Sequence, residues 1–296
     1  MTTKAVIILA VLIVAVPGIV IWQKPGRREP EPVYEGKTLS DWVVLLDSHT
    51  EHQAQNEAAA QALQTMGQKA VPGLIRILHK RADPPLVTKA KALAVRFHLL
   101  RPPELQLAEL QYRAARACCI LGGWSDFDIR AAIPDLAYSL TNNVSGMLEP
   151  FAWGLAYSGP EGLSVITNVM ATDRSPQVRR AAAHSLWISK NFRTPEITRA
   201  LISATRDPVP DVRVTAILDL RGFLREKNLA TIIIPGVLPC LQDTDAQVRR
   251  WTVELLAPYS SLPEAGIALT NMLNDPDPTV RDVVERSLQK TALASP

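Results

Sequence analysis

One short pattern recurs four times between Asp173 and Leu288, and it restricts the fold more than any other feature of the chain. Each copy has an aspartate, an arginine six positions later, and a valine directly before the arginine. The arginines follow one another at intervals of 34, 36 and 32 residues. A nearly constant interval of this length is typical of proteins that stack one supersecondary unit. The four pairs are Asp173 with Arg179, Asp207 with Arg213, Asp243 with Arg249, and Asp275 with Arg281.

Prolines also recur at one equivalent position of the repeating unit. Pro72, Pro134 and Pro235 each lie inside a similar short apolar run. Proline is tolerated in the first turn of a helix, because its missing N–H would have no partner there. We therefore predict that each of the three prolines begins the second helix of a helix–turn–helix unit.

The aspartate and the arginine of the pattern both have physical roles in such a unit. An aspartate ahead of a helix accepts hydrogen bonds from the free N–H groups of the first turn and complements the helix dipole. An arginine has several donors in a fixed geometry, and it can reach the carbonyls of a turn or the next aspartate. We interpret both as structural residues and assign no catalytic role to them.

These residues resemble the HEAT-repeat family of armadillo-like α-solenoids, including short-period bacterial repeats also found in phycobilin lyase subunits. The resemblance covers residues 51–290 and is most specific from Asp173 onward. It implies an all-α, right-handed solenoid of about six helix–turn–helix repeats. It also implies that the aspartate lies in the turn and the arginine at the start of the second helix. The eight residues would then form a polar ladder along the stack.

The N-terminus contains a long apolar segment. After a short polar start at residues 1–4, residues 5–22 contain no charged side chain and end with Trp22. Eighteen residues reach the length of a transmembrane helix and exceed a usual signal-peptide core. We therefore expect a single-pass signal-anchor, with a cleaved signal peptide as the alternative. The apolar segment and residues 38–42 (TLSDW) resemble membrane-anchored bacterial HEAT-repeat proteins.

The folded part follows the anchor. Residues 23–38 are rich in proline and charge and indicate a linker, and residues 39–296 would form the solenoid. Lys24, Arg27 and Arg28 after the apolar segment favour a cytoplasmic body by the positive-inside rule. A short basic start before an apolar run indicates export. Between these conflicting signals we favour the extracytoplasmic side.

A helical insertion is expected at about residues 84–101, between two proline pairs. Leu86, Ala90 and Leu93 fall on one helical face, and the remainder of the segment is basic. A basic amphipathic helix can contact anionic lipid or an acidic partner. The alternative is an ordinary solvated helix face.

Helical phase predicts a surface for binding. The pattern valines, with the residues four and eight positions later, point in one direction and should form the core. The opposite stripe is the candidate face, and exposed apolar residues rimmed by arginine are common at protein-binding sites. The alternative is that neighbouring elements cover these side chains. The candidate face consists of Arg180, His184, Trp187, Val214, Leu218, Arg221, Arg250 and Glu254.

Sequence motifs for catalysis or metal binding are not found. The chain has no phosphate-binding loop, no paired C-x-x-C, no H-E-x-x-H and no G-x-S-x-G. His49 and His52 form the only compact group with ligand-like spacing, and a solvated polar turn explains them better. Cys118, Cys119 and Cys240 are interpreted as small apolar residues. We expect no catalytic residue, metal or cofactor.

The sequence favours a membrane-tethered, non-catalytic scaffold that binds a protein partner on the solenoid surface. An accessory subunit of a phycobilin-lyase-like or other modifying enzyme is the alternative. Nucleic-acid binding is disfavoured because 32 basic and 29 acidic residues leave a net charge of only +3. No small-molecule substrate is indicated.

Overall fold

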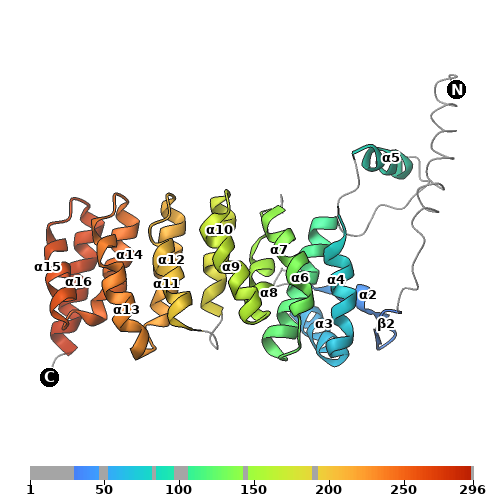
Figure 1. The fold of residues 1–296 in the computed structure, drawn as a ribbon, viewed down its shortest axis with the longest axis horizontal. Helices are drawn as coiled ribbons and strands as arrows, with labels where there is room; N and C mark the ends of the chain where they lie inside the picture. The colour runs from blue at the N-terminus through green and yellow to red at the C-terminus, as the bar shows by residue number, and fades with distance from the viewer. Residues whose placement is uncertain are drawn as a thin grey trace, which may run out of the picture.

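A computed structural model of the chain describes residues 30–46, 53–81, 85–96, 106–142, 146–188 and 193–294. Its helices stand in a row from the N-terminal to the C-terminal end of this part (Figure 1). Within these ranges, no helix has both the length and the apolar character needed to cross a bilayer. The expected anchor at residues 5–22 and the histidine group at residues 47–52 lie outside the described residues.

The row is built from short helices of similar length. Most are joined by tight turns or by single turns of 3-10 helix. The helices of the stack are α3 (Gln53–Met66), α4 (Val71–His79), α6 (Leu107–Trp124), α7 (Ile133–Asn142), α8 (Glu149–Tyr157), α9 (Pro160–Thr172), α10 (Pro176–Ser185), α11 (Pro195–Ala204), α12 (Pro210–Phe223), α13 (Lys227–Val237), α14 (Ala246–Leu256), α15 (Pro263–Asn271) and α16 (Pro278–Ala294).

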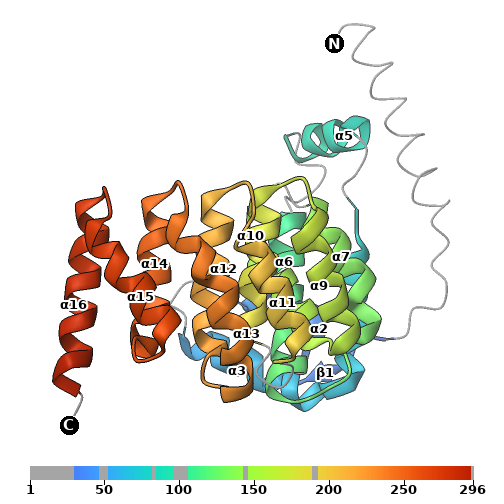
Figure 2. The ribbon, with the colours of Figure 1, turned by 60° about the vertical axis from the view of Figure 1, so that its left-hand side comes forward.

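These helices form two layers. In one layer α6, α8, α10, α12, α14 and α16 pack in succession, and in the other α4, α7, α9, α11 and α13 follow one another. Each helix of the second layer also packs on a helix of the first, so that α4 with α6, α7 with α8 and α9 with α10 are helix pairs. The last six helices, α11 to α16, form the C-terminal end of the row (Figure 2), where α11 and α13 both pack on α12. This is the architecture of a helical solenoid.

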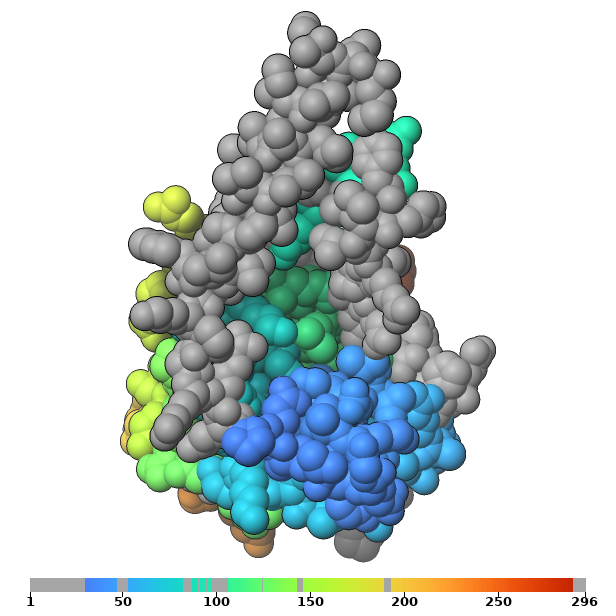
Figure 3. Space-filling model, turned by 90° about the vertical axis from the view of Figure 1, so that its right-hand side faces the viewer, coloured from blue at the N-terminus to red at the C-terminus, as the bar shows by residue number. Residues whose placement is uncertain are grey.

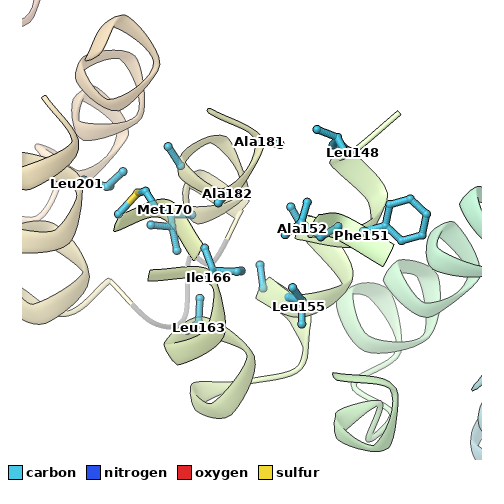
Figure 4. Close-up of a cluster of buried hydrophobic side chains, with 14 of the residues drawn as sticks. Leu148, Phe151, Ala152, Leu155, Leu163, Ile166, Met170, Ala181, Ala182 and Leu201 are labelled. Carbon is cyan, nitrogen blue, oxygen red and sulfur yellow. The ribbon is translucent and has the colours of Figure 1, made fainter. Parts of the chain in front are cut away.

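The apolar core runs between the two layers. Figure 4 shows one section of it, where Phe151 and Leu155 of α8, Ile166 of α9 and Leu201 of α11 point between the helices. The predicted core positions confirm the helical phase: the four pattern valines and the residues four positions later are all buried. Leu288, eight positions after the last valine, is partly buried against the same core.

A hairpin and a short helix cover the N-terminal end of the stack (Figure 3). β1 (Val33–Tyr34) pairs antiparallel with β2 (Lys37–Thr38), and α2 (Leu39–Leu45) follows directly. Residues 33–38 were expected to belong to the linker. They form a hairpin because Glu35 and Gly36 both take positive φ values, 48° and 74°, as a two-residue hairpin turn requires.

Helix α2 closes the core of the first unit. Thr38 is its N-cap and forms a capping box with Asp41. Trp42 is 3% exposed, and its Nε1 donates to the Tyr34 carbonyl at 3.1 Å. The indole therefore ties the hairpin to the helix while its ring covers apolar side chains that would otherwise end the stack in water.

One of the local predictions needs correction. Pro72 lies in the first turn of α4 and Pro134 is the second residue of α7, but Pro235 lies inside α13. Helix α13 begins at Lys227 because the residues before the proline also continue the apolar core. Glycine is common just beyond the end of a helix, yet Gly122 lies inside α6, which continues to Trp124. A Cβ on Gly122 would lie 2.7 Å from Cδ1 of Ile129, so this glycine permits close packing.

The predicted insertion is the helix α5 (Pro85–Arg96). Figures 1 and 2 show it above the row, clear of both layers. Helices α4 and α6, which flank it in the sequence, pack directly on each other. The stack is therefore continuous without α5.

Candidate functional site

The Asp–Arg residues form a series of ion pairs between successive units. Arg179 donates from Nε and Nη2 to the two carboxylate oxygens of Asp207, at 2.7 and 2.8 Å. Arg249 binds Asp275 in the same two-bond geometry and at the same two distances. Arg213 reaches Asp243 through Nη2 alone, at 2.7 Å. Each arginine therefore pairs with the aspartate of the following unit.

The same side chains also hold their own turns. The Nη1 groups of Arg179, Arg213, Arg249 and Arg281 donate to the backbone carbonyls of Asp173, Asp207, Asp243 and Asp275 at 2.6–2.9 Å. Each of these aspartates accepts the N–H two residues later at 2.8–2.9 Å. One arginine thus connects two consecutive turns, which explains why the pattern repeats with the unit.

Two of the ladder carboxylates, Asp207 and Asp275, are held in their ionised form. Burial alone would raise the pKa of Asp207, but the hydrogen bonds from Arg179 and from the Val209 N–H outweigh it and lower that pKa. The pKa of Asp275 is lowered in the same way by Arg249 and the Asp277 N–H. Carboxylates fixed in this manner are poor proton donors at neutral pH. The geometry of the ladder is that of a structural network.

The candidate face lies on the outer side of the layer that contains α10, α12 and α14. Trp187, in the 3-10 turn Leu186–Ile188, is 43% exposed, and Leu218 of α12 is 39% exposed. Val214 is half-buried and packs against the core. Two of the three apolar residues of the face therefore reach solvent.

Charged contacts join these helices across the face. Arg180 of α10 lies 3.6 Å from Glu149 of α8, and Arg221 of α12 lies 3.9 Å from Glu254 of α14. Arg250 lies 3.7 Å from the same glutamate. The structure thus brings the charged residues of α10, α12 and α14 onto one continuous surface, with Glu149 added from α8.

Asp219 is a residue of this surface that the sequence reasoning missed. It is 5% exposed, and its Oδ1 lies 3.4 Å from Nδ1 of His184. Burial raises the pKa of Asp219 to about 6, although the contact with His184 opposes this. The hydrogen bond with Asp219 raises the pKa of His184. The sequence signal was present, because Asp219 lies seven positions after Val212 and so occupies the core side of α12.

A surface hollow and a buried thiol lie outside the candidate face. A hollow of about 350 Å³ lies beside the middle rung of the ladder, between the turns at residues 205–207 and 239–244. Its arginines, Arg206 and Arg213, face Asp207 and Asp243, so its charges balance. The thiol of Cys118 is fully buried, and this burial raises its pKa to about 12. The thiol is therefore protonated at neutral pH and acts as a packing group.

Side chains that can bind metals are not clustered in the described part of the chain. Within the described residues, no group of three histidine, cysteine, aspartate or glutamate side chains could hold a metal ion. The features with functional geometry are thus the ladder and the candidate face.

Residues 198–289 match the family model for HEAT repeats. The chain contains HEAT repeats. The match includes three of the four Asp–Arg copies, and the first copy lies ahead of it. No curated protein matches the chain in sequence.

Solved structures with a similar fold include three proteins. YibA of Escherichia coli is 19% identical, covers 71% of this chain and 76% of its own, and gives a TM-score of 0.45. The complex of CpcE and CpcF of phycocyanin lyase from Nostoc sp. PCC7120 is 18% identical, with coverage of 88% and 100% and a TM-score of 0.33. Human deoxyhypusine hydroxylase is 15% identical, with coverage of 85% and 93% and a TM-score of 0.31. All three are less than 20% identical to this chain with TM-scores below 0.5, and none of their activities is transferred to it.

Proposed function

We propose that the protein is a membrane-tethered, non-catalytic scaffold that binds a protein partner on the candidate face. The observation that carries the proposal is the exposure of Trp187 and Leu218 on neighbouring helices of one layer. Exposed apolar patches with a polar rim mark interaction sites, and Trp and Arg are enriched among binding hot spots. The right-handed winding implied by HEAT repeats, and the anchor at residues 5–22 with an extracytoplasmic solenoid, belong to the same proposal.

The charged rim suits a partner that offers carboxylates beside an apolar side chain. The side chains of Arg180 and Arg221 are 45% and 59% exposed. Their contacts with Glu149 and Glu254, at 3.6 and 3.9 Å, are longer than hydrogen bonds. Exposed ion pairs of this kind contribute little to stability. A carboxylate of the partner can therefore replace them at small cost.

The test is photo-crosslinking in intact cells. A photoreactive residue placed at position 187 should capture one dominant protein. The same residue at position 267 is the matched control, because Ile267 is 66% exposed on α15, outside the layer that contains α10, α12 and α14. Protease accessibility in the same cells determines the side of the membrane.

Substitution completes the test. The double variant Trp187→Ala with Leu218→Ser should bind that partner at least about tenfold more weakly, since hot-spot side chains contribute about 1–2 kcal/mol or more. Its helix content by circular dichroism should equal that of the parent, and Ile267→Ser should bind normally. Capture of the same partner at the parental yield by the double variant would falsify the assignment of the face.

The alternative function, an accessory subunit of a phycobilin-lyase-like or other modifying enzyme, rests on the repeat architecture alone. It ranks second because the candidate face accounts for exposed side chains of this particular chain. Genes for chromophore-carrying proteins beside the gene for this chain would favour the alternative.

A further inference from the structure

Helix α5 stands outside the stack, and the stack does not need it. Helices α4 and α6 form one pair of the solenoid and contact each other directly. The helix is inserted between them, and Figures 1 and 2 show it clear of both layers. An ordered insertion that contributes nothing to the core calls for another function.

The charge of the insertion has one sign. Residues 84–103 contain no aspartate or glutamate. Lys89, Lys91 and Arg96 are all exposed on α5. Leu93 is 40% exposed, although leucine is ordinarily buried. The helix therefore presents both positive charge and apolar surface to its surroundings.

The two properties are segregated around the helix. At 100° per residue, positions 86, 87, 90, 93 and 94 fall within one arc of about 120°, and all five are apolar. Lys89 and Lys91 flank this arc on its two sides. A basic helix with one apolar arc and lysines along its edges is the form that lies in the plane of a membrane surface.

We propose that α5 binds the surface of an anionic lipid bilayer as a second membrane contact of the protein. The proposal rests on the proposed tether at residues 5–22, which would bring the solenoid to the membrane. The seven residues between that segment and residue 30 span at most about 25 Å. A tether of this length keeps the solenoid close to the bilayer, which raises the effective concentration of lipid around a second, weak contact.

Anionic lipid explains the charges better than an acidic protein does. Lys24, Arg27 and Arg28 directly follow the apolar segment, so the tether and α5 carry the same charge sign. A membrane surface attracts each basic residue by about fivefold in affinity, and the attraction disappears with neutral lipid. An anionic bilayer would therefore accommodate the apolar arc of α5, attract its lysines, and attract the basic residues that follow the apolar segment.

The proposal is tested on the full chain with an environment-sensitive fluorophore. The Leu93→Cys variant carries the probe on the apolar arc, and Ala92→Cys carries it on an exposed position of the opposite side. Cys118 and Cys240 are buried, and Cys119 is partly buried, so position 93 is labelled first. The vesicles consist of phosphatidylcholine alone, or of phosphatidylcholine mixed with phosphatidylglycerol.

We expect the probe at position 93 to move into an apolar environment on the mixed vesicles only, while the probe at position 92 stays aqueous. Lys89→Gln with Lys91→Gln should weaken this response about 25-fold, because two basic residues are lost. An aqueous signal from position 93 on the mixed vesicles, or equal signals from both positions, overturns the proposal.

Flotation of the same samples separates α5 from the tether. The tether requires no anionic lipid, so the chain should float with both kinds of vesicle. If it floats with both and position 93 remains aqueous, the tether stands and the α5 proposal is wrong. If it floats only with phosphatidylglycerol and position 93 responds, α5 binds lipid and the tether is wrong.

Discussion

The ladder makes a quantitative prediction about Arg249. Its side chain is 9% exposed and binds both oxygens of Asp275, which is 6% exposed. The variant Arg249→Met replaces the apolar stem of the arginine but not its guanidinium, and it leaves a buried carboxylate with the Asp277 N–H as its remaining hydrogen-bond donor. Removal of one partner of a buried ion pair costs about 3–5 kcal/mol. Because this pair lies at the rim of the stack, we expect a loss of about 3 kcal/mol in the free energy of unfolding.

Arg281 is the matched control because it has the same position in the last unit. It donates to the backbone carbonyls of Asp275 and Pro276 at 2.6 and 3.1 Å, and both carbonyls lie in its own turn. Arg281→Met should therefore cost about 1 kcal/mol, the value of ordinary hydrogen bonds. The assay is urea unfolding of both variants at neutral pH. Equal losses for the two variants would show that the pairing between units does not stabilise the stack.

A double-mutant cycle isolates the pair itself. Asp275→Asn retains the acceptor for the Asp277 N–H and removes the negative charge. The combination with Arg249→Met should be less destabilising than the sum of the single changes, by about 2 kcal/mol. Since a repeat stack loses stability at the affected junction, hydrogen exchange should accelerate in α15 and α16 before the other helices. Additive single losses would refute the assignment of a direct pair.

Two further predictions concern packing and charge. Gly123→Ala should lower the free energy of unfolding by about 1–3 kcal/mol, because the added Cβ would lie 2.6 Å from the Tyr157 ring. Gly222→Ala is the control, since its Cβ would meet only a guanidinium nitrogen at 3.8 Å. This second variant should be neutral or stabilising in the same urea assay. Asp219→Asn should lower the pKa of His184 in an NMR titration, because the partner that raises it loses its charge. An unchanged histidine pKa would contradict the pairing with Asp219.

Local spacing was sufficient to predict the helical phase. In α12 the spacing of Val212, Ala216 and Leu220 places all three on one side of any helix that contains them, and all three are buried. The same phase places Leu218 on the opposite side, where it is exposed. These predictions succeed because they depend on helix geometry within a single element.

The same pattern does not predict which residues of different segments contact each other. The sequence allows Arg179 to reach turn carbonyls or the next aspartate, and the structure shows that it binds both the carbonyl of Asp173 and the carboxylate of Asp207. Gly122 resembles a helix terminator until Ile129, which comes from another segment, is placed against it. In each case the deciding contact is made by a residue that helical periodicity does not bring close.

The ladder restrains the helices that present the candidate face. Arg179 is held by the turn before α10 and by Asp207 in the turn before α12, so these two helices cannot rotate independently about their axes. Trp187 follows α10 and Leu218 lies on α12, so the rung also fixes how the two exposed side chains face each other. A partner that binds both residues meets a surface that is already ordered, and it loses little conformational entropy on association. The repeated Arg–Asp ion pairs thus support binding indirectly, because they hold side chains of separate repeats in fixed relative positions.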